Sequence, residues 1–287
     1  MKMNTIDREQ LDIILENHIH WLNKDCDDWE NMKADLRFAN LEDTDLRCVN
    51  LKGADLRFAN IIRADLSDAN FEDANFCCTC IKSANLENAN LSNANLASAN
   101  LYNANLKNAN LQGAYFRGAN LSDANLMYAN LSNAIFICAN LSNAVLMYAD
   151  LNGADTRDAN IFDVDFRDAK NVPYIPMSCP EEGDFIAWKK AKVSRGNVIV
   201  KLSIPADAKR SSATSRKCRC NKAKVLEIYN IDGTVAIERK CHSYHDRYFI
   251  YEVGKTVEVD DFNEDRWSEC SQGIHFFINR QEAINYL

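Results

Sequence analysis

Residues 84–106 read ANLENANLSNANLASANLYNANL, a run of five-residue units in which Ala comes first, Asn second and Leu third. The same unit, A(D/N)LXX, starts at Ala34 and continues without an insertion to about Phe166, which makes roughly 27 repeats. A helix needs apolar residues about every 3.6 positions and a half-buried strand needs them at alternate positions, so a period of five fits neither. The period therefore predicts a chain that bends once in every repeat.

Each unit divides into an extended half and a turn. Ala and Leu are two residues apart, so both face the same side of an extended segment, while the Asn or Asp between them faces away. The two residues that follow are mostly Ser, Asn, Asp, Gly, Lys or Arg, many of which favour turns. The sequence predicts a coil filled with Leu, Phe and Ala. Its turns must stack, because one turn alone buries too little apolar area to be stable.

These units resemble the pentapeptide-repeat family, and the resemblance covers nearly half of the chain. It implies a right-handed β-helix with four sides per coil. On that basis the repeats make nearly seven coils, and at about 4.8 Å per coil the rod is about 30 Å long. We therefore expect a mostly β protein: a right-handed quadrilateral β-helix with an N-terminal capping helix, followed by a small β-rich α+β domain.

The chain divides into four parts by pattern. Residues 1–33 hold an apolar helical face between Thr5 and Leu22 and are predicted to cap the first coil. Residues 34–170 are the β-helix, and residues 171–183 form a linker with three of the four prolines. Residues 184–287 form the C-terminal domain.

Strand patterns recur through the C-terminal domain, and a short helix through Tyr286 is expected to start with a capping box of Asn279 and Glu282. The turn Asp232-Gly233 predicts a hairpin. The expected strands are residues 185–193, 198–204, 223–229, 234–238, 248–253, 256–259 and 273–277.

Composition bounds the class of protein. The 287 residues are 47% hydrophobic and 26% charged, which is typical of a soluble globular protein. No segment is apolar enough to cross a bilayer, and the charged start does not resemble a signal peptide, so we expect a cytoplasmic protein without a membrane partner. The 11 Cys are scattered, which favours reduced thiols over a disulfide framework.

Some outward positions of the later repeats carry apolar side chains. With four sides per coil, Met127 stacks with Met147 and Tyr128 with Tyr148. A neighbouring corner carries Tyr115, Ile135 and Ile137 in place of the usual polar residues. Exposed apolar patches often mark contacts, so we predict that the C-terminal domain or a second subunit packs here; isolated surface residues are the alternative. The predicted interaction patch is Tyr115, Met127, Tyr128, Ile135, Ile137, Val145, Met147 and Tyr148.

Cysteine and histidine residues offer weaker hypotheses. Cys77, Cys78 and Cys80 face outward, but their spacing matches no established metal site. Cys270 with His275 has the residue types of a nucleophile and its base, without an identifiable third group. A richer set, which also lacks zinc-finger spacing, is Cys218, Cys220, Cys241, His242, His245, Cys270 and His275. We predict no metal and no cofactor.

The sharpest charge feature is a basic segment between residues 209 and 224, which contains no acidic residue. It could bind phosphate and thereby nucleic acid, but it lacks interleaved aromatic residues, so a solvated loop or an interdomain contact is equally expected. Its cations are Lys209, Arg210, Arg216, Lys217, Arg219, Lys222 and Lys224.

No motif requires catalysis, so we predict a non-enzymatic scaffold or protein-interaction module, in which a rigid rod presents a C-terminal recognition domain to an unidentified protein partner. The segments IPADAKRSSATSRKCRC and DRWSECSQGIHFFINRQEA are similar to an uncharacterised domain that follows pentapeptide repeats in bacterial and bacteriophage proteins. That resemblance implies no activity.

Two other functions stay open. The family resemblance suggests a nucleic-acid mimic that acts on a DNA-binding enzyme such as a topoisomerase, although the central repeats here are nearly uncharged. Alternatively, the C-terminal domain is an enzyme or a nucleic-acid binder. The sequence is compatible with a monomer or a homodimer.

Overall fold

The computed structural model describes residues 3–175, 177–212, 214–267 and 271–286. The chain forms two compact units, Met1–Tyr174 and Ile175–Leu287. The boundary lies within the predicted linker, and the later part of that linker contributes Cys179 to the core of the second unit. Among the described residues, neither helix has the length and apolar composition needed to span a membrane.

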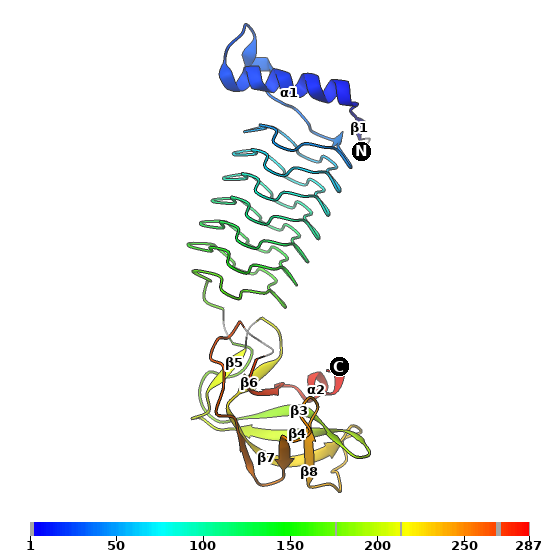
Figure 1. The fold of residues 1–287 in the computed structure, drawn as a ribbon, viewed down its shortest axis with the longest axis vertical. Helices are drawn as coiled ribbons and strands as arrows, with labels where there is room; N and C mark the ends of the chain where they lie inside the picture. The colour runs from blue at the N-terminus through cyan, green and yellow to red at the C-terminus, as the bar shows by residue number, and fades with distance from the viewer. Residues whose placement is uncertain (1–2, 176, 213, 268–270, 287) are drawn as a thin grey trace. The chain divides into compact units, whose positions relative to one another are not determined.

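The first unit is built from stacked coils of twenty residues (Figure 1). The second residue of each repeat forms a parallel bridge with the residue twenty positions later, from Asp35↔Asp55 through to Asp150↔Lys170. Backbone hydrogen bonds join each coil to the next; for example, Leu86 N–H donates to Asn105 O over 2.7 Å. Because the chain bends every five residues, each coil has four sides.

The coil interior is filled as the repeat predicts. Leu, Ile and Phe at the third position are almost all fully buried, and Phe116 stacks on Phe136 with 4.9 Å between ring centroids. Thr156, the one polar residue in this column, is only partly buried. The fifth position takes the left-handed conformation, with a φ of 61° at Asn88 and 68° at Gly113, which explains the Asn, Asp, Ser and Gly found there.

Asparagine ladders run along the outside of the coils. The side-chain amide of Asn90 donates to Asn70 Oδ1 over 3.0 Å, and that of Asn110 donates to Asn90 Oδ1 over 3.0 Å. Each Asn oxygen also accepts a nearby backbone N–H, as Asn90 does from Ser92 over 3.2 Å. These ladders satisfy polar groups on the faces of the coil and stabilise the stacking of its turns.

The N-terminal segment packs on the first coils. β1 (Asn4–Thr5) pairs in parallel with β2 (Ala39–Asn40), and α1 (Arg8–Asn23) is followed by the 3-10 turn η1 (Trp29–Asn31). Asp7 and Gln10 form a capping box at the start of α1. His18 is fully buried between α1 and the coil, where it accepts a hydrogen bond from Ala34 N–H over 3.0 Å.

The second unit contains two antiparallel sheets. A six-stranded sheet has the order β10-β7-β4-β3-β8-β9, with β3 (Phe185–Val193), β4 (Gly196–Ile204), β7 (Lys222–Asn230), β8 (Lys240–Ser243), β9 (Ile250–Glu252) and β10 (Thr256–Glu258). A three-stranded sheet has the order β11-β6-β5, with β5 (Arg210–Ser212), β6 (Cys218–Cys220) and β11 (Ile274–Phe276). The main core combines residues of both sheets. The helix α2 (Arg280–Asn285) contributes Ala283 to a smaller cluster with Ile199 and Phe277.

Three details of the C-terminal domain differ from the sequence predictions. The turn at Asp232-Gly233 forms, but residues 234–238 make only the bridge Val235↔Tyr229 and no strand. The strands β5, β6 and β8 were not predicted, because three or four residues are too few to show an alternating pattern. Asn279 caps α2 through Gln281 N–H over 2.7 Å, whereas Glu282 pairs with Arg216 instead of completing the capping box.

Candidate functional site

The candidate site lies beside the edge of β3 that faces away from β4. The opposite edge of β3 pairs with β4 along its whole length. The other edge pairs with two different segments: Trp188 forms a bridge with Phe277, and Ala191 and Lys192 pair with β8. Lys189 and Lys190 lie between these two pairings, where β8 and the end of β11 diverge. The divergence opens a pocket at the edge of the sheet.

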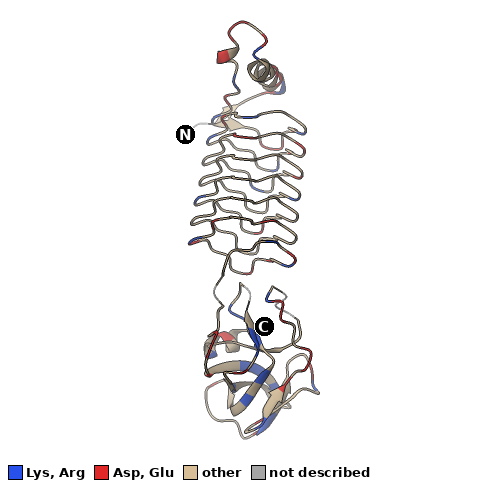
Figure 2. Cartoon of the chain, turned by 90° about the vertical axis from the view of Figure 1, so that its left-hand side faces the viewer, with Lys and Arg blue, Asp and Glu red and all other residues tan. Residues whose placement is uncertain are grey.

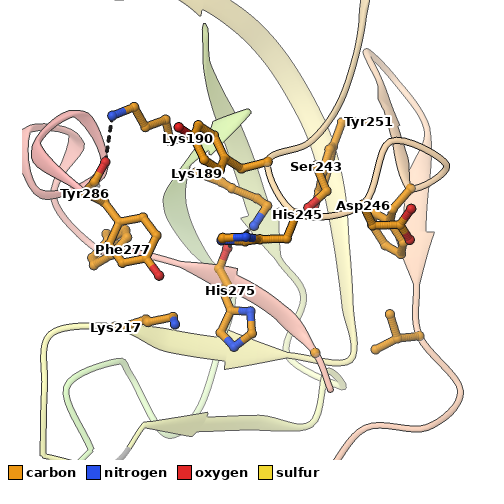
Figure 3. Close-up of a pocket in the computed structure, with 14 residues that line it drawn as sticks. Lys189, Lys190, Lys217, Ser243, His245, Asp246, Tyr251, His275, Phe277 and Tyr286 are labelled. Carbon is orange, nitrogen blue, oxygen red and sulfur yellow. Dashed lines mark hydrogen bonds between the residues drawn. The ribbon is translucent and has the colours of Figure 1, made fainter. Parts of the chain in front are cut away.

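The pocket has a volume of about 420 Å³. Its lining combines cationic, aromatic and hydrogen-bonding side chains from β3, β9, β11, the β8–β9 loop and the C-terminal end of the domain, as Figure 3 shows. This is the size and mixture typical of a small-molecule site. The residues that carry its chemistry are Lys189, Lys190, Lys217, Ser243, His245, Asp246, Tyr251, His275, Phe277 and Tyr286.

Lys189 occupies an unusual position in the strand. It has the same strand parity as Ala187 and Ala191, which are fully buried in the main core, so its side chain extends on the inner face of the sheet. Its Nζ donates to His275 O over 3.0 Å and lies 5.7 Å from the centre of the Tyr251 ring. Burial, with a further contribution from the nearby Lys217 charge, lowers the pKa of Lys189 to about 8.

The other two lysines have different surroundings. Lys190 Nζ donates to Tyr286 O over 2.6 Å and to Ile284 O over 3.1 Å, so it binds the carbonyl groups at the C-terminal end of α2. Lys217 Nζ lies 5.3 Å from the centre of the Tyr286 ring and is partly exposed. Lys190 therefore stabilises the wall of the pocket, while Lys189 and Lys217 supply positive charge inside it.

The buried thiols near Lys189 are poor nucleophiles. Burial raises the pKa of Cys220 to about 12 and that of Cys241 to about 12, so both stay protonated at neutral pH. Burial also raises the pKa of the Tyr251 hydroxyl well above its usual value. The arrangement is suited to binding an organic anion: cations for its charge, and the rings of Phe249, Tyr251 and Phe277 for its apolar part.

The predicted basic segment is mostly a structural element. Arg219 is only 2% exposed; its guanidinium donates to Asn263 O over 2.5 Å and to Asp265 O, and thereby holds the loop between β10 and β11. Arg210 donates to several backbone carbonyls, including Pro205 O over 2.7 Å.

Other cations of that segment form ion pairs with acidic side chains. Lys209 pairs with Glu264, Lys222 pairs with Asp207, and Arg216 pairs with Glu282 over 2.8 Å. Lys224 is exposed on β7, and Lys217 lines the pocket. Figure 2 shows the Lys and Arg residues of this unit distributed over its strands and loops. Lys209, Arg210, Arg216, Arg219 and Lys222 thus bind groups of the domain itself.

The predicted interaction patch separates into two clusters. Tyr115 and Ile135 form a bridge on one side of the coil, with Ile137 at the next bend. Val145 forms a bridge with Asn125. This column is offset by ten residues, or half of a twenty-residue coil, from the column of Tyr115 and Ile135. The two clusters therefore face opposite sides of the coil, so the sequence interpretation as one neighbouring patch needs this correction.

The second cluster contains a well-ordered aromatic pair. Tyr128 and Tyr148 stack with 4.8 Å between ring centroids, and they are 50% and 40% exposed. Met127 and Met147 are the adjacent residues at the same bend and are partly exposed. Of the residues in the predicted patch, Tyr128 and Tyr148 are the exposed large hydrophobic side chains.

Among the described residues of the C-terminal domain, the cysteines and histidines do not form a group of three potential metal ligands. Cys218 and Cys220 are buried in β6, Cys241 is buried in β8, and His242 Nδ1 lies 2.9 Å from Ser243 O. Cys270, proposed as a nucleophile with His275, lies outside the described residues. Cys77 Sγ lies 3.5 Å from Cys78 Sγ at one bend of the coil. Within the described part of the chain, the group of three potential ligands is His20, Asp25 and Cys26, of which Asp25 is exposed and the other two are partly buried.

Sequence reasoning missed the pocket, although it named His245, His275 and Lys217 for other roles. The available signal was the alternation of residues 185–193, in which Phe185, Ala187, Ala191 and Val193 face one side and Lys189 interrupts them. A lysine at an inward position is seldom found without a reason. The surroundings of the Lys189 side chain depend on the pairing of β3 with two separate segments. A local sequence pattern does not reveal that pairing.

Comparison with known families agrees with the fold. Residues 34–73, 54–93, 84–123 and 124–161 match the model for pentapeptide repeats (8 copies), and residues 175–283 match a family of unknown function (DUF5758). No curated protein is significantly similar in sequence.

Solved structures include several repeat proteins similar to part of this chain. HetL, a pentapeptide repeat protein involved in heterocyst differentiation regulation from the cyanobacterium Nostoc sp. strain PCC 7120, is 27% identical over 48% of this chain and 78% of its own, with a TM-score of 0.32. A pentapeptide repeat protein from the Arabidopsis thaliana thylakoid lumen is 27% identical over 45% of this chain and 71% of its own, with a TM-score of 0.22. QnrB1, a plasmid-mediated fluoroquinolone resistance protein, is 20% identical over 47% of this chain and 78% of its own, with a TM-score of 0.27. The sequence, the coils and the family model agree that residues 34–161 of this chain are pentapeptide repeats, and residues 175–283 match a family of unknown function.

Proposed function

We propose that this chain is a non-enzymatic binding protein in which the repeat unit is a rigid body and the C-terminal domain binds a small aromatic carboxylate. The observation that carries this proposal is the 420 Å³ pocket, in which Lys189 and Lys217 lie among aromatic rings. A carboxylate pairs with Lys217, and an aromatic ring fits beside Phe249 and Phe277. The raised pKa values of Cys220 and Cys241 support binding without nucleophilic turnover.

Calorimetric titration of the full chain with 4-(hydroxymethyl)benzoate tests this function. We expect binding, and we expect no binding of the uncharged analogue 4-(hydroxymethyl)benzamide. Lys217→Met should weaken binding about tenfold, since a hydrogen bond to a charged group contributes about 1.5–3 kcal/mol. Lys201→Met is the matched control, because Lys201 lies on β4 outside the pocket. Equal affinity for the acid and the amide, or an unchanged Lys217→Met variant, would contradict the proposal.

We also propose that the repeat unit contacts a protein, either an unidentified partner or a second copy of the chain. The Tyr128–Tyr148 stack with its flanking methionines supports this, because exposed, pre-ordered aromatic side chains are favourable contact residues. If the partner is a second copy, the double variant Met147→Asp, Tyr148→Asp should lower the oligomeric state measured by sedimentation. An unchanged oligomeric state would contradict self-association through this cluster.

Charge pairing in the coils weighs against imitation of a nucleic acid. In five repeats an Asp accepts from the Arg two residues later, as Asp55 does from Arg57 over 2.6 Å. Such pairs present little net charge, unlike a row of phosphates. The pairs are Asp35–Arg37, Asp45–Arg47, Asp55–Arg57, Asp155–Arg157 and Asp165–Arg167. The scattered cysteines support a cytoplasmic location as part of the proposal.

A further inference from the structure

We propose that Lys189 forms a reversible imine with the pocket's ligand, and that this ligand is an aromatic aldehyde or an aromatic α-keto acid. The inference rests on the proposed function, since the carboxylate of the ligand is held by the positive charge of the pocket. It adds a carbonyl carbon placed against the Lys189 amine. The known family relationships assign no such site to the C-terminal domain.

The geometry distinguishes Lys189 from the other lysines of the pocket. Its stem lies on the inner face of β3, and its Nζ is held in place by a 3.0 Å hydrogen bond to His275 O. Figure 3 shows the amine extending into the centre of the pocket, toward His275. The Lys190 amine is directed to two carbonyl groups at the end of α2 instead. Lys189 is therefore the amine that a ligand in this pocket meets at a fixed position.

Protonation also favours Lys189, because only a neutral amine attacks a carbonyl carbon. With its pKa lowered to about 8, about one-tenth of Lys189 is neutral at pH 7. An ordinary lysine with a pKa near 10.4 is neutral to only about one part in 2,500, so Lys189 has an advantage of a few hundredfold.

The charged and titratable groups around this amine come from the segment before β6, from β6, β8, β9 and β11, and from the β8–β9 loop. Lys217 adds positive charge from the segment before β6, and Tyr251 on β9 and the thiols of Cys220 and Cys241 are neutral near pH 7. His275 lies on β11, and His245 and Asp246 lie on the β8–β9 loop at the exposed side of the pocket.

The chemical step balances without an oxidant or a reductant. The nitrogen lone pair forms a bond to the carbonyl carbon, the C=O π electrons move to oxygen, and a proton passes from nitrogen to that oxygen to give a carbinolamine. The hydroxyl group then leaves as water together with the remaining proton on nitrogen, and the nitrogen lone pair forms the C=N bond. Addition of water reverses both steps and releases the ligand unchanged.

Borohydride trapping of the full chain tests the inference. The probe is 4-formylbenzoate at pH 7 with sodium cyanoborohydride, followed by peptide mapping. We expect one reduced adduct on Lys189, formed at least tenfold faster than on any other lysine and suppressed by excess 4-(hydroxymethyl)benzoate. Lys189→Arg should lose this adduct while it keeps the positive charge. Lys201→Arg, a change outside the pocket, should keep it.

A second measurement covers the case in which Lys189→Arg does not fold. In the unaltered chain, the rate of adduct formation at Lys189 should rise with pH and reach half of its maximum near pH 8. A rate that rises only near the pKa of an ordinary lysine, or adducts spread evenly over surface lysines, would overturn the inference.

The outcomes separate this inference from the proposed function. Binding of 4-(hydroxymethyl)benzoate without a Lys189 adduct would leave the binding function standing and make the imine wrong. Absence of binding by both compounds would make both proposals wrong. An adduct on Lys189 that 4-(hydroxymethyl)benzoate suppresses supports both.

Discussion

At the scale of the residue, the bends of the coil depend on the left-handed backbone at the fifth position of each repeat. Gly113 and Gly118 both have this conformation, with φ values of 68° and 65°. Their surroundings differ, because a Cβ on Gly113 would lie 2.6 Å from Asn93 Oδ1, whereas a Cβ on Gly118 would have its nearest neighbour, Ser98 Oγ, at 3.7 Å. The two positions thus separate backbone strain from a steric clash.

We predict that Gly118→Ala lowers the free energy of unfolding by about 1 kcal/mol, the cost of a left-handed conformation for an L-residue. Gly113→Ala should cost about 1 kcal/mol more, because it also displaces the Asn93 side chain, whose amide donates to Asp73 Oδ1 over 3.3 Å. Denaturant titration followed by tryptophan fluorescence measures both values. Equal destabilisation of the two variants would show that the Asn93 contact contributes nothing.

At the scale of the element, α1 is attached to the coil through a histidine that must be neutral. His18 Nδ1 accepts from Ala34 N–H over 3.0 Å, and Nε2 lies 3.1 Å from Lys52 O, to which the neutral Nε2–H tautomer donates. Burial lowers the pKa of His18 from 6.5; the hydrogen bond to Lys52 O opposes this effect, and the Lys33 charge adds to it. Protonation would remove the acceptor that Ala34 uses.

The sign of the pH effect follows from the lowered pKa. The folded His18 binds a proton less readily than the unfolded one, so its contribution to stability is complete above about pH 6.5 and is lost as pH falls through the folded pKa. We predict weaker hydrogen-exchange protection of α1 at pH 5.5 than at pH 7, after correction for intrinsic exchange. His18→Gln should lose this pH dependence. His20→Gln, which changes the partly exposed histidine beside Asp25, should retain it; identical pH profiles for the two variants would refute the assignment.

The basic segment from Lys209 to Lys224 leads to a negative prediction at the same scale. Its arginines and lysines mostly bind carbonyl or carboxylate groups of the domain itself. We therefore expect no salt-dependent binding of a fluorescent oligonucleotide to the full chain, measured by anisotropy at low salt. Binding that falls as salt rises, and that is lost in an Arg216→Glu, Lys217→Glu variant, would restore the nucleic-acid hypothesis.

The elements also show what a local pattern can predict. The five-residue period of the column from Leu36 to Phe166 is visible in the sequence without knowledge of any tertiary contact. The coil and its buried side chains were therefore predictable from the sequence. The long strands β3, β4 and β7 were likewise predictable. The pocket was not, since it arises where Phe277 and Ser243, distant in sequence, pair with neighbouring parts of one strand edge.

At the scale of the whole molecule, the two units have separate cores and should unfold separately. Trp21 and Trp29 lie in the first unit, and Trp188 and Trp267 lie in the second. We predict two thermal unfolding transitions. 4-(hydroxymethyl)benzoate should raise the midpoint temperature of only the transition assigned to the second unit. Binding at 100 times the dissociation constant would stabilise that unit by about 2.7 kcal/mol. Calorimetry with and without the ligand measures this, and an equal shift of both transitions would contradict independent units.

The twenty-residue register that aligns the asparagine ladders also sets how this gene can change in length. Loss of a single five-residue unit between Tyr128 and Tyr148 keeps every bend intact but advances all later residues by a quarter of a coil, so that Tyr148 would no longer lie over Tyr128. Loss of four units restores the alignment of every column. Because most central units are nearly identical in sequence, small duplications and deletions in the reading frame should be tolerated there. Each such event turns the downstream surface in steps of one side, a discrete source of variation that point mutation does not provide.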